Sequence, residues 1–279
     1  MAIDAWNPIT FGEEITAPLS AHSRIVYEYH VEDRRLMDEH LRSSPYQSLE
    51  PNRCFPAYQE FREHILAPLL ARSRIRTWHY TRLTDDEVDA MKRCLVVSSL
   101  DYLRHRLSTL VENNLLGRDD ADTVFAQSPF QEQLQNRTGR LWTTVIPLPH
   151  NDSGVTPLLE SWGGESAYFW LRDERVAVTL KRLGAPRIVE IETALTDNRN
   201  GYSVAEIALR AWARRLGAPT NLCGCDLSIT CSIASAKVIR IHTEGDGTFD
   251  AVATIYPEGV GPLLEEQVSY EYGELESEG

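Results

Sequence analysis

The segment RIRTWHY, residues 74–80, constrains the fold more than any other part of the sequence. Every second side chain, from Ile75 to His79, falls on one side of an extended chain, which is typical of a strand with one buried face. Thr84 and Glu87 follow at the spacing of a helix capping box, and apolar residues then recur at helical spacing. We therefore expect a strand, a short turn with His79 at the strand's exit, and a helix.

The same two periodicities predict the other elements. Helices are expected at residues 58–70, 100–116, 173–183 and 204–216. Strands are expected at residues 25–31, 141–148, 168–171, 187–195, 226–229 and 237–242. This mixture favours an α+β domain whose sheet is mixed or antiparallel, with flanking helices. We place that domain at residues 75–262, after an N-terminal extension, residues 1–74, that packs on it, and before an acidic and mobile tail, residues 263–279.

Charge and composition exclude several classes of protein. The net charge of −13 argues against a generic nucleic-acid binder, because neutralising phosphates requires a basic face. No stretch approaches the roughly 18 apolar residues of a membrane helix, and the N-terminus lacks the pattern of a secretory signal, so we expect a cytoplasmic protein without a membrane partner. The five cysteines, an odd number, indicate reduced thiols rather than a disulfide framework or a zinc site. The sequence contains no P-loop, zinc-protease or serine-hydrolase motif.

His79 is the first candidate functional residue. It is placed where a strand hands over to a helix, a common position for site residues. Polar residues follow it, namely Tyr80, Thr81 and Arg82. The imidazole, phenol and hydroxyl groups together could bind a ligand rich in hydroxyl groups. The competing interpretation is a histidine with a structural role.

A pair of glycines precedes an aromatic cluster in the middle of the chain. Gly163 and Gly164 permit a backbone with positive φ or a close approach to a ligand. In the predicted strand, Tyr168 and Trp170 share one face and Phe169 takes the other. The aromatic rings could form a stacking platform for a flat ring, or they could pack in the core with Phe169 buried.

Two acidic positions complete the candidates. Asp226 begins the predicted strand 226–229, where it is either a turn former or a functional carboxylate. His242 and Glu244 lie two residues apart after residues 237–242, so they would share a face of a continued strand and could act as an acid–base pair.

The order of these motifs resembles the ADP-ribosyltransferase superfamily, whose members hold NAD⁺ with a His–Tyr–Glu trio. That family's first motif is His-Gly-Thr or His-Gly-Ser, and the chain has His79-Tyr80-Thr81. The family's glycine turn into Tyr-Phe corresponds to Gly163-Gly164 followed by Tyr168-Phe169. Its glutamate at the start of a late strand corresponds to Asp226. The resemblance covers about residues 75–244 and implies a split β-sheet with flanking helices.

The resemblance implies a role for each matching residue. His79, Tyr80 and Thr81 would bind NAD⁺, with His79 on the adenosine ribose. Gly164, Tyr168 and Phe169 would complete the cofactor site, with Tyr168 stacked on the nicotinamide. Asp226 would stabilise the positive charge that develops on the ribose as nicotinamide leaves.

Two departures from the family pattern affect these expectations. Tyr80 replaces a small glycine, and Asp226 is one methylene shorter than glutamate. The activity implied is mono-ADP-ribosyl transfer to an unknown protein or nucleic-acid acceptor, as in bacterial toxins and defence effectors, or NAD⁺ hydrolysis.

Two rival interpretations stay open. One is a binding module of the same fold without the chemistry, which would recognise a nucleotide or a protein partner, including an inhibitor. The other is a different enzyme that uses His242 and Glu244 with Tyr80. Arg82 is a secondary candidate for the site.

Overall fold

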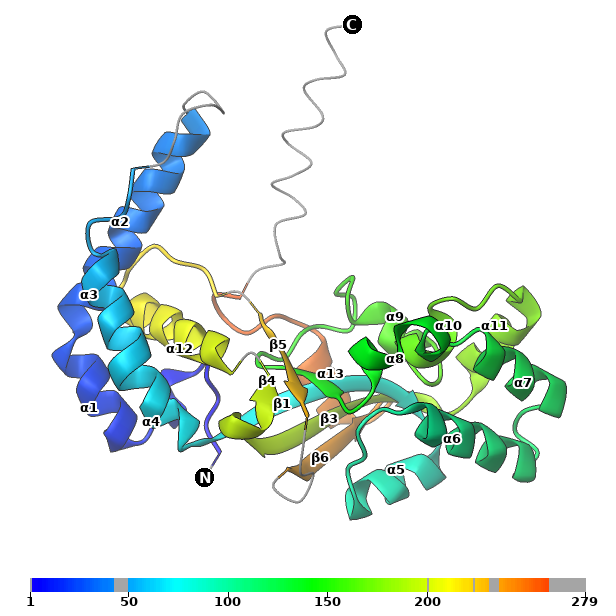
Figure 1. Ribbon diagram of the computed structural model, residues 1–279. Coiled ribbons are helices and arrows are strands. Elements are labelled where there is room, and N and C mark those ends of the chain that lie inside the picture. Colours follow the sequence, from blue (N-terminus) through cyan, green and yellow to red (C-terminus); the bar gives the residue numbers. More distant parts are fainter. Residues whose placement is uncertain (1, 43–49, 200, 223, 231–235, 261–279) are drawn as a thin grey trace, which may run out of the picture.

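The computed structural model describes residues 2–42, 50–199, 201–222, 224–230 and 236–260. Six strands form one sheet in the order β4-β5-β2-β1-β3-β6, and all neighbouring strands pair antiparallel. The strands are β1 (Arg74–Leu83), β2 (Leu141–Thr144), β3 (Ala185–Ala194), β4 (Asn198–Arg199), β5 (Asp226–Ile229) and β6 (Lys237–Thr243). With flanking helices, the chain is an α+β protein (Figure 1).

The sheet consists of two halves that are joined at a single point. β1 pairs with β3 over ten residues, from Arg74↔Ala194 to Leu83↔Ala185. Between β1 and β2, by contrast, the register within the described residues has one pair, Trp78↔Thr144. The strands β4-β5-β2 and β1-β3-β6 therefore separate beyond this pair.

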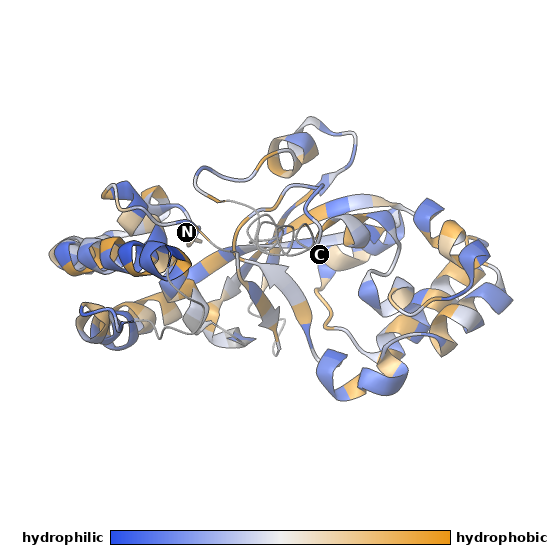
Figure 2. Ribbon diagram, turned by 90° about the horizontal axis from the view of Figure 1, so that it is seen from above, coloured by the Kyte–Doolittle hydropathy of each residue, from blue (hydrophilic) through white to orange (hydrophobic). Residues whose placement is uncertain are grey.

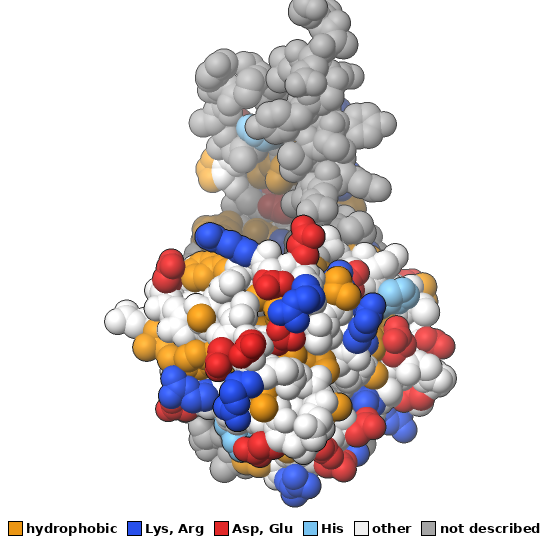
Figure 3. Space-filling model, turned by 90° about the vertical axis from the view of Figure 1, so that its right-hand side faces the viewer, with side chains coloured by type: hydrophobic (Ala, Val, Ile, Leu, Met, Phe, Trp, Pro, Cys, Tyr) orange, Lys and Arg blue, Asp and Glu red, His pale blue; other side chains and the backbone are white. Residues whose placement is uncertain are grey.

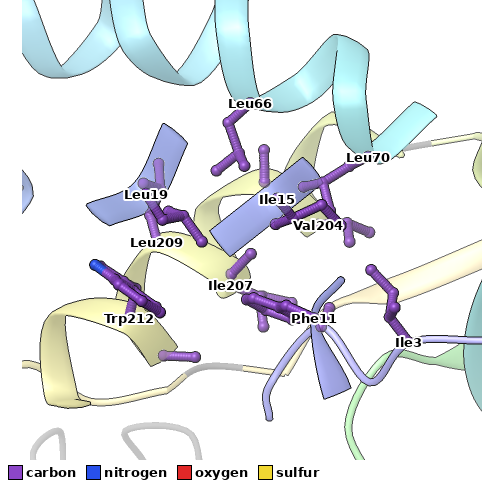
Figure 4. Packing of buried hydrophobic residues seen from close by; sticks show 14 of the residues in the cluster. Ile3, Phe11, Ile15, Leu19, Leu66, Leu70, Val204, Ile207, Leu209 and Trp212 are labelled. Atoms are coloured by element: carbon purple, nitrogen blue, oxygen red, sulfur yellow. The ribbon is translucent and has the colours of Figure 1, made fainter. Parts of the chain in front are cut away.

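Helices from the first quarter of the chain gather at one end of the sheet with α12 (Figure 1). They are α1 (Glu13–Ala21), α2 (Ser23–Arg42), α3 (Phe55–Glu60), α4 (Ala67–Ala71) and α12 (Tyr202–Arg215), with short turns η1 (Pro8–Thr10), η2 (Phe61–Leu66, a π-helical segment) and η3 (Leu195–Asp197). Figure 4 shows Leu19, Leu66 and Ile207 converging from α1, η2 and α12. Residues before β1 thus share a hydrophobic core with a helix from the second half of the chain.

A second group of helices covers the opposite end of the sheet (Figure 1). It comprises α5 (Asp85–Arg93), α6 (Leu100–Glu112), α7 (Arg118–Ala126), α8 (Phe130–Arg137), α9 (Thr156–Glu160), α10 (Glu165–Tyr168) and α11 (Glu174–Arg182), while α13 (Gly247–Ala253) follows β6. The helices at both ends mix hydrophobic and hydrophilic residues, as expected for amphipathic helices on a core (Figure 2). The face at this end of the molecule carries acidic and basic side chains side by side (Figure 3). Within this group of helices, Arg175 pairs with Asp120 and Lys181 pairs with Glu160.

Most predicted elements are confirmed. The strands at β1, β3, β5 and β6 and the helices α6, α11 and α12 lie where the periodicity placed them. The capping box is present, with the Thr84 hydroxyl accepting from the Glu87 amide and the Glu87 carboxylate accepting from the Thr84 amide. Among the described residues, no helix combines the length and the apolar character needed to cross a membrane.

Three local predictions are wrong. Residues 25–31 lie within α2 and not in a strand, since Val26 and His30, four residues apart, are the positions that become buried. The strand expected at 141–148 ends at Thr144. The aromatic strand at 168–171 is absent, because Gly163 and Gly164, with φ of 81° and 56°, turn the chain directly into α10.

Candidate functional site

A pocket of 690 Å³ opens where β1 and β2 separate. Residues 78–81 of β1 and all of β2 line it on the sheet side. Helices α6 and α8 line it from the second helical group, and the turn 163–166 and the start of β5 close it. The pocket therefore lies in the split between the two halves of the sheet.

His79 lines this pocket from the middle of β1 and not from the strand's exit, because β1 continues to Leu83. Its Nδ1 lies 2.8 Å from the main-chain oxygen of Trp142, and since a carbonyl can only accept, Nδ1 donates. Burial lowers the pKa of His79, and the charge of Arg106 lowers it further, while the bond to Trp142 acts against them. The ring is therefore neutral at pH 7, with Nε2 free of any partner among the described residues.

Asp226 begins β5, where the sequence predicted the start of a strand, and its side chain lines the same pocket. It is in register with Thr144, which is in register with Trp78, so two strand spacings of about 4.8 Å separate it from β1. Its carboxylate accepts no hydrogen bond from the described residues. The side chain of Asp226 is exposed, but the surface that it exposes faces the pocket. The surrounding pocket walls therefore still desolvate the carboxylate, and this burial raises its pKa.

Two more carboxylates, which the sequence patterns did not indicate, act on Asp226. The charges of Glu165 and then Asp152 raise the pKa of Asp226 further, after burial. Both residues line the pocket. Asp152 accepts from the Tyr256 hydroxyl at 2.6 Å, and Glu165 pairs with Arg137 at 2.9 Å. Three acids therefore concentrate negative potential at one end of the pocket.

Arginines line the pocket on the side of the second helical group. Arg106 comes from α6, Arg137 from the end of α8, and Arg140 from the turn before β2. The sequence carried one signal for Arg106, which lies directly beside the buried stripe of Leu103 and Leu107. A charged residue at the edge of an apolar helix face needs a partner or a ligand.

Tyr80, Thr81 and Arg82 differ in how they relate to the pocket. Tyr80 and Thr81 line it, both nearly fully buried. The Tyr80 hydroxyl donates to the Leu148 oxygen and accepts from the Leu148 amide, at 3.1 and 2.6 Å, so it is already satisfied. Arg82 is not in the lining, and its guanidinium donates to three main-chain oxygens, including that of Leu183 at 2.8 Å. Arg82 therefore joins elements together.

The predicted glycine–aromatic motif is divided by the structure. Gly163 and Gly164 line the pocket, but Tyr168 and Phe169 are not among its lining residues. Phe169 is 52% exposed, which disagrees with the interpretation that it packs in the core, because α10 and not a strand sets its direction. Aromatic residues from other elements line the pocket instead, among them Trp142 and Tyr256.

His242 and Glu244 do not form the acid–base pair considered above. His242 is 2% exposed, and its Nε2 lies 2.8 Å from Glu190, whereas Glu244 is exposed beyond the end of β6. Glu190 is buried, because β6 and Arg76 of β1 cover it. This cluster lies outside the pocket lining.

Within the described ranges, no group of three or more His, Cys, Asp or Glu residues is arranged to hold a metal ion. Comparison of the chain with models of protein families, with curated proteins and with solved structures finds no match. A function has to follow from the chemistry of the pocket itself.

Proposed function

We propose that the protein cleaves the nicotinamide–ribose bond of NAD⁺ and transfers ADP-ribose to a macromolecular acceptor or to water. The observation that carries this proposal is Asp226, a carboxylate without a hydrogen-bond partner among the described residues. It lies in the same pocket as the acceptor nitrogen of His79 and beside two further acids, Glu165 and Asp152.

This arrangement suits a reaction in which positive charge develops on a sugar. When the bond between ribose C1′ and the pyridinium nitrogen breaks, the electron pair leaves with nicotinamide and C1′ becomes cationic. A fixed carboxylate such as Asp226 stabilises that charge, and the nearby Glu165 strengthens the negative potential. An acceptor hydroxyl, amine or carboxylate, or water, then bonds to C1′ and releases its proton, if it has one.

His79 is suited to hold the substrate. With its Nδ1–H committed to Trp142, the neutral ring offers Nε2 as an acceptor for a ribose hydroxyl. The hydrogen bond to the backbone also fixes the ring, which reduces the ordering cost of binding.

The resemblance to ADP-ribosyltransferases agrees with part of this geometry. Its first motif supplies three pocket residues in β1, its late acidic residue begins β5, and the sheet is divided into halves. Two departures favour a second candidate, a nucleotide-binding module without turnover. Tyr80 is held by Leu148, and Tyr168 lies outside the lining. In that case NAD⁺ would raise the melting temperature and stay intact.

The test is release of nicotinamide from NAD⁺ by the purified protein, alone and with cell lysate. We expect release that His79→Ala and Asp226→Asn each reduce at least tenfold, since each removes a stabilising contact of about 1.4 kcal/mol or more. His64→Ala and Asp250→Asn, at exposed positions outside the pocket, are the matched controls. Labelled NAD⁺ separates transfer, which labels a lysate component, from hydrolysis. Thermal stabilisation without release under either condition would leave the binding module as the better account.

A further inference from the structure

Arg106 is a cation of the pocket that is held in place by a hydrogen bond and by an aromatic ring. Its Nε donates to Glu87 Oε1 at 2.7 Å, and its guanidinium carbon lies 4.4 Å from the centre of the Trp162 ring. The side chain is 13% exposed. Hydrogen bond and ring together leave the guanidinium little freedom, so its remaining nitrogens have a set direction.

Glu87 fixes Arg106 from outside the pocket, because it is not among the lining residues. Its other oxygen, Oε2, accepts from the Trp162 indole and from the Thr84 amide, both at 2.8 Å. Burial raises the pKa of Glu87, but Arg106 and these donors outweigh it, and the pKa is lowered. Glu87 is thus ionised, and within the described residues it accepts from Arg106 only through Nε, so it does not satisfy the two Nη nitrogens of the guanidinium.

Two nitrogens of Arg106 are left without an acceptor among the described residues. Nη2 is buried and has no hydrogen-bond partner, and Nη1 donates no hydrogen bond to any described residue. A charged donor in this state is costly unless something else accepts from it. Arg140 lines the same pocket with its guanidinium 5.8 Å from the Trp142 ring centre and no ion pair within the described ranges.

The geometry points to a phosphoryl-binding subsite formed by Arg106 and Arg140, in which Glu87 is the positioning residue that holds Arg106. A phosphate oxygen pair matches the fork of a guanidinium, and a diphosphate can reach two arginines. Arg137 is not part of this subsite, since Glu165 already pairs with it. The inference rests on the proposed function only in the sense that the diphosphate would be that of NAD⁺.

The experiment compares ADP with adenosine by calorimetry, because the two differ only in the diphosphate. We expect wild-type protein to bind ADP more tightly, and the preference to weaken as salt rises. Arg106→Gln should weaken ADP binding about tenfold to a hundredfold, the loss of one charge-assisted hydrogen bond or more, and adenosine binding less than twofold. Arg104→Gln, an exposed arginine on the same helix outside the lining, is the matched control.

Glu87 is tested separately through the same preference. Glu87→Gln keeps the shape of the side chain. It should reduce the ratio of ADP affinity to adenosine affinity, although residue 87 does not line the pocket. Trp162→Phe keeps a ring beneath Arg106, so it should retain more of the preference for ADP than Glu87→Gln does. A variant that loses both affinities equally would mark a merely structural role for Glu87.

Equal affinity of wild type for ADP and adenosine, no ADP binding at millimolar concentration, or an Arg106→Gln variant that keeps the preference would each overturn the subsite. These outcomes are separable from failure of the proposed function. A preference for ADP without nicotinamide release supports the subsite and contradicts the proposed enzymatic activity. Nicotinamide release without a preference for ADP supports the activity and contradicts the subsite.

Discussion

His79 and Trp142 are joined across the point where β1 and β2 separate, by a hydrogen bond from the imidazole Nδ1 to the main-chain oxygen at 2.8 Å. The bond holds one side of the opening to the other. It also decides which ring nitrogen carries the proton, because the carbonyl can only accept. The chemistry of the pocket depends on that choice.

The tautomer of His79 can be measured directly. We expect nitrogen NMR to show a protonated Nδ1 and an unprotonated Nε2 at pH 7. Burial lowers the pKa of this imidazole below its usual 6.5, so titration should occur below pH 6.5. If nicotinamide release needs the neutral ring, its rate should decrease at acidic pH as His79 becomes protonated. His64→Ala simplifies the spectrum without touching the pocket; a proton on Nε2 at pH 7 would contradict the assignment.

Asp226→Asn should reduce nicotinamide release at least tenfold while raising the melting temperature. The pKa of Asp226 is raised above its usual 3.8, first by burial and then by Glu165 and Asp152. Its ionised form is therefore less stable in the folded than in the unfolded chain. The protonated side chain costs the fold nothing below pH 3.8, and this favourable condition is lost as pH rises through the folded pKa. At pH 7 the ionised Asp226 therefore lowers the free energy of unfolding, and asparagine removes that destabilisation. We expect a gain on the order of 1–3 °C, because the group faces solvent in the pocket.

That gain should vanish when the melts are repeated below pH 3.8, where aspartate is protonated in both states. Asp250→Asn, at an exposed position of α13, should change neither activity nor melting temperature by a comparable amount. An asparagine variant that melts lower at pH 7 would show that Asp226 has a stabilising partner.

The extended and helical periods of the sequence predicted most elements because local chemistry decides them. The alternation in residues 74–80 and the Thr84–Glu87 capping box need no distant information. Residues 25–31 failed because β-branched content and helical spacing compete there, and packing on other helices decided the outcome.

Candidate residues of the pocket could be predicted from the sequence only where a strand fixes the direction of the side chain. His79 and Asp226 lie on strands that the sequence marked, and the sheet brings both into one pocket. The positions of Arg106, Glu165 and Asp152 depend on how helices and loops return to the sheet, which periodicity does not report. Tyr168 was misplaced because two glycines with positive φ start a helix where aromatic content favoured a strand.

Glu190→Gln should weaken the fold without affecting the pocket. Burial raises the pKa of Glu190, but the His242 hydrogen bond and Arg76 outweigh it, so the pKa is lowered. The stability it contributes is present above its usual pKa of 4.5 and is lost as pH falls through the folded value. Removing one member of a buried ion pair costs about 3 kcal/mol, which corresponds to roughly 6–12 °C in melting temperature.

Nicotinamide release by Glu190→Gln should stay within about twofold of wild type at a temperature where both are folded. Glu244→Gln, an exposed change next to the same strand, should alter stability by less than about 0.5 kcal/mol. If Glu244→Gln or His242→Gln instead abolished release from folded protein, the chemistry would lie at β6 and not in the pocket.

Gly164→Ala tests whether the turn before α10 places Glu165. Gly164 has φ 56° and ψ −153°, a conformation that is nearly restricted to glycine. Since an added Cβ would find ordinary space, with Leu158 at 3.7 Å, the cost is backbone strain of about 1–3 kcal/mol. To relieve it the turn must shift, and Glu165 and the pocket wall shift with it. We expect a lower melting temperature and weaker nicotinamide release, whereas Gly247→Ala, in open space at the start of α13, should leave both nearly unchanged. Equal melting temperatures for the two alanine variants would mean that the turn at Gly164 adapts without strain.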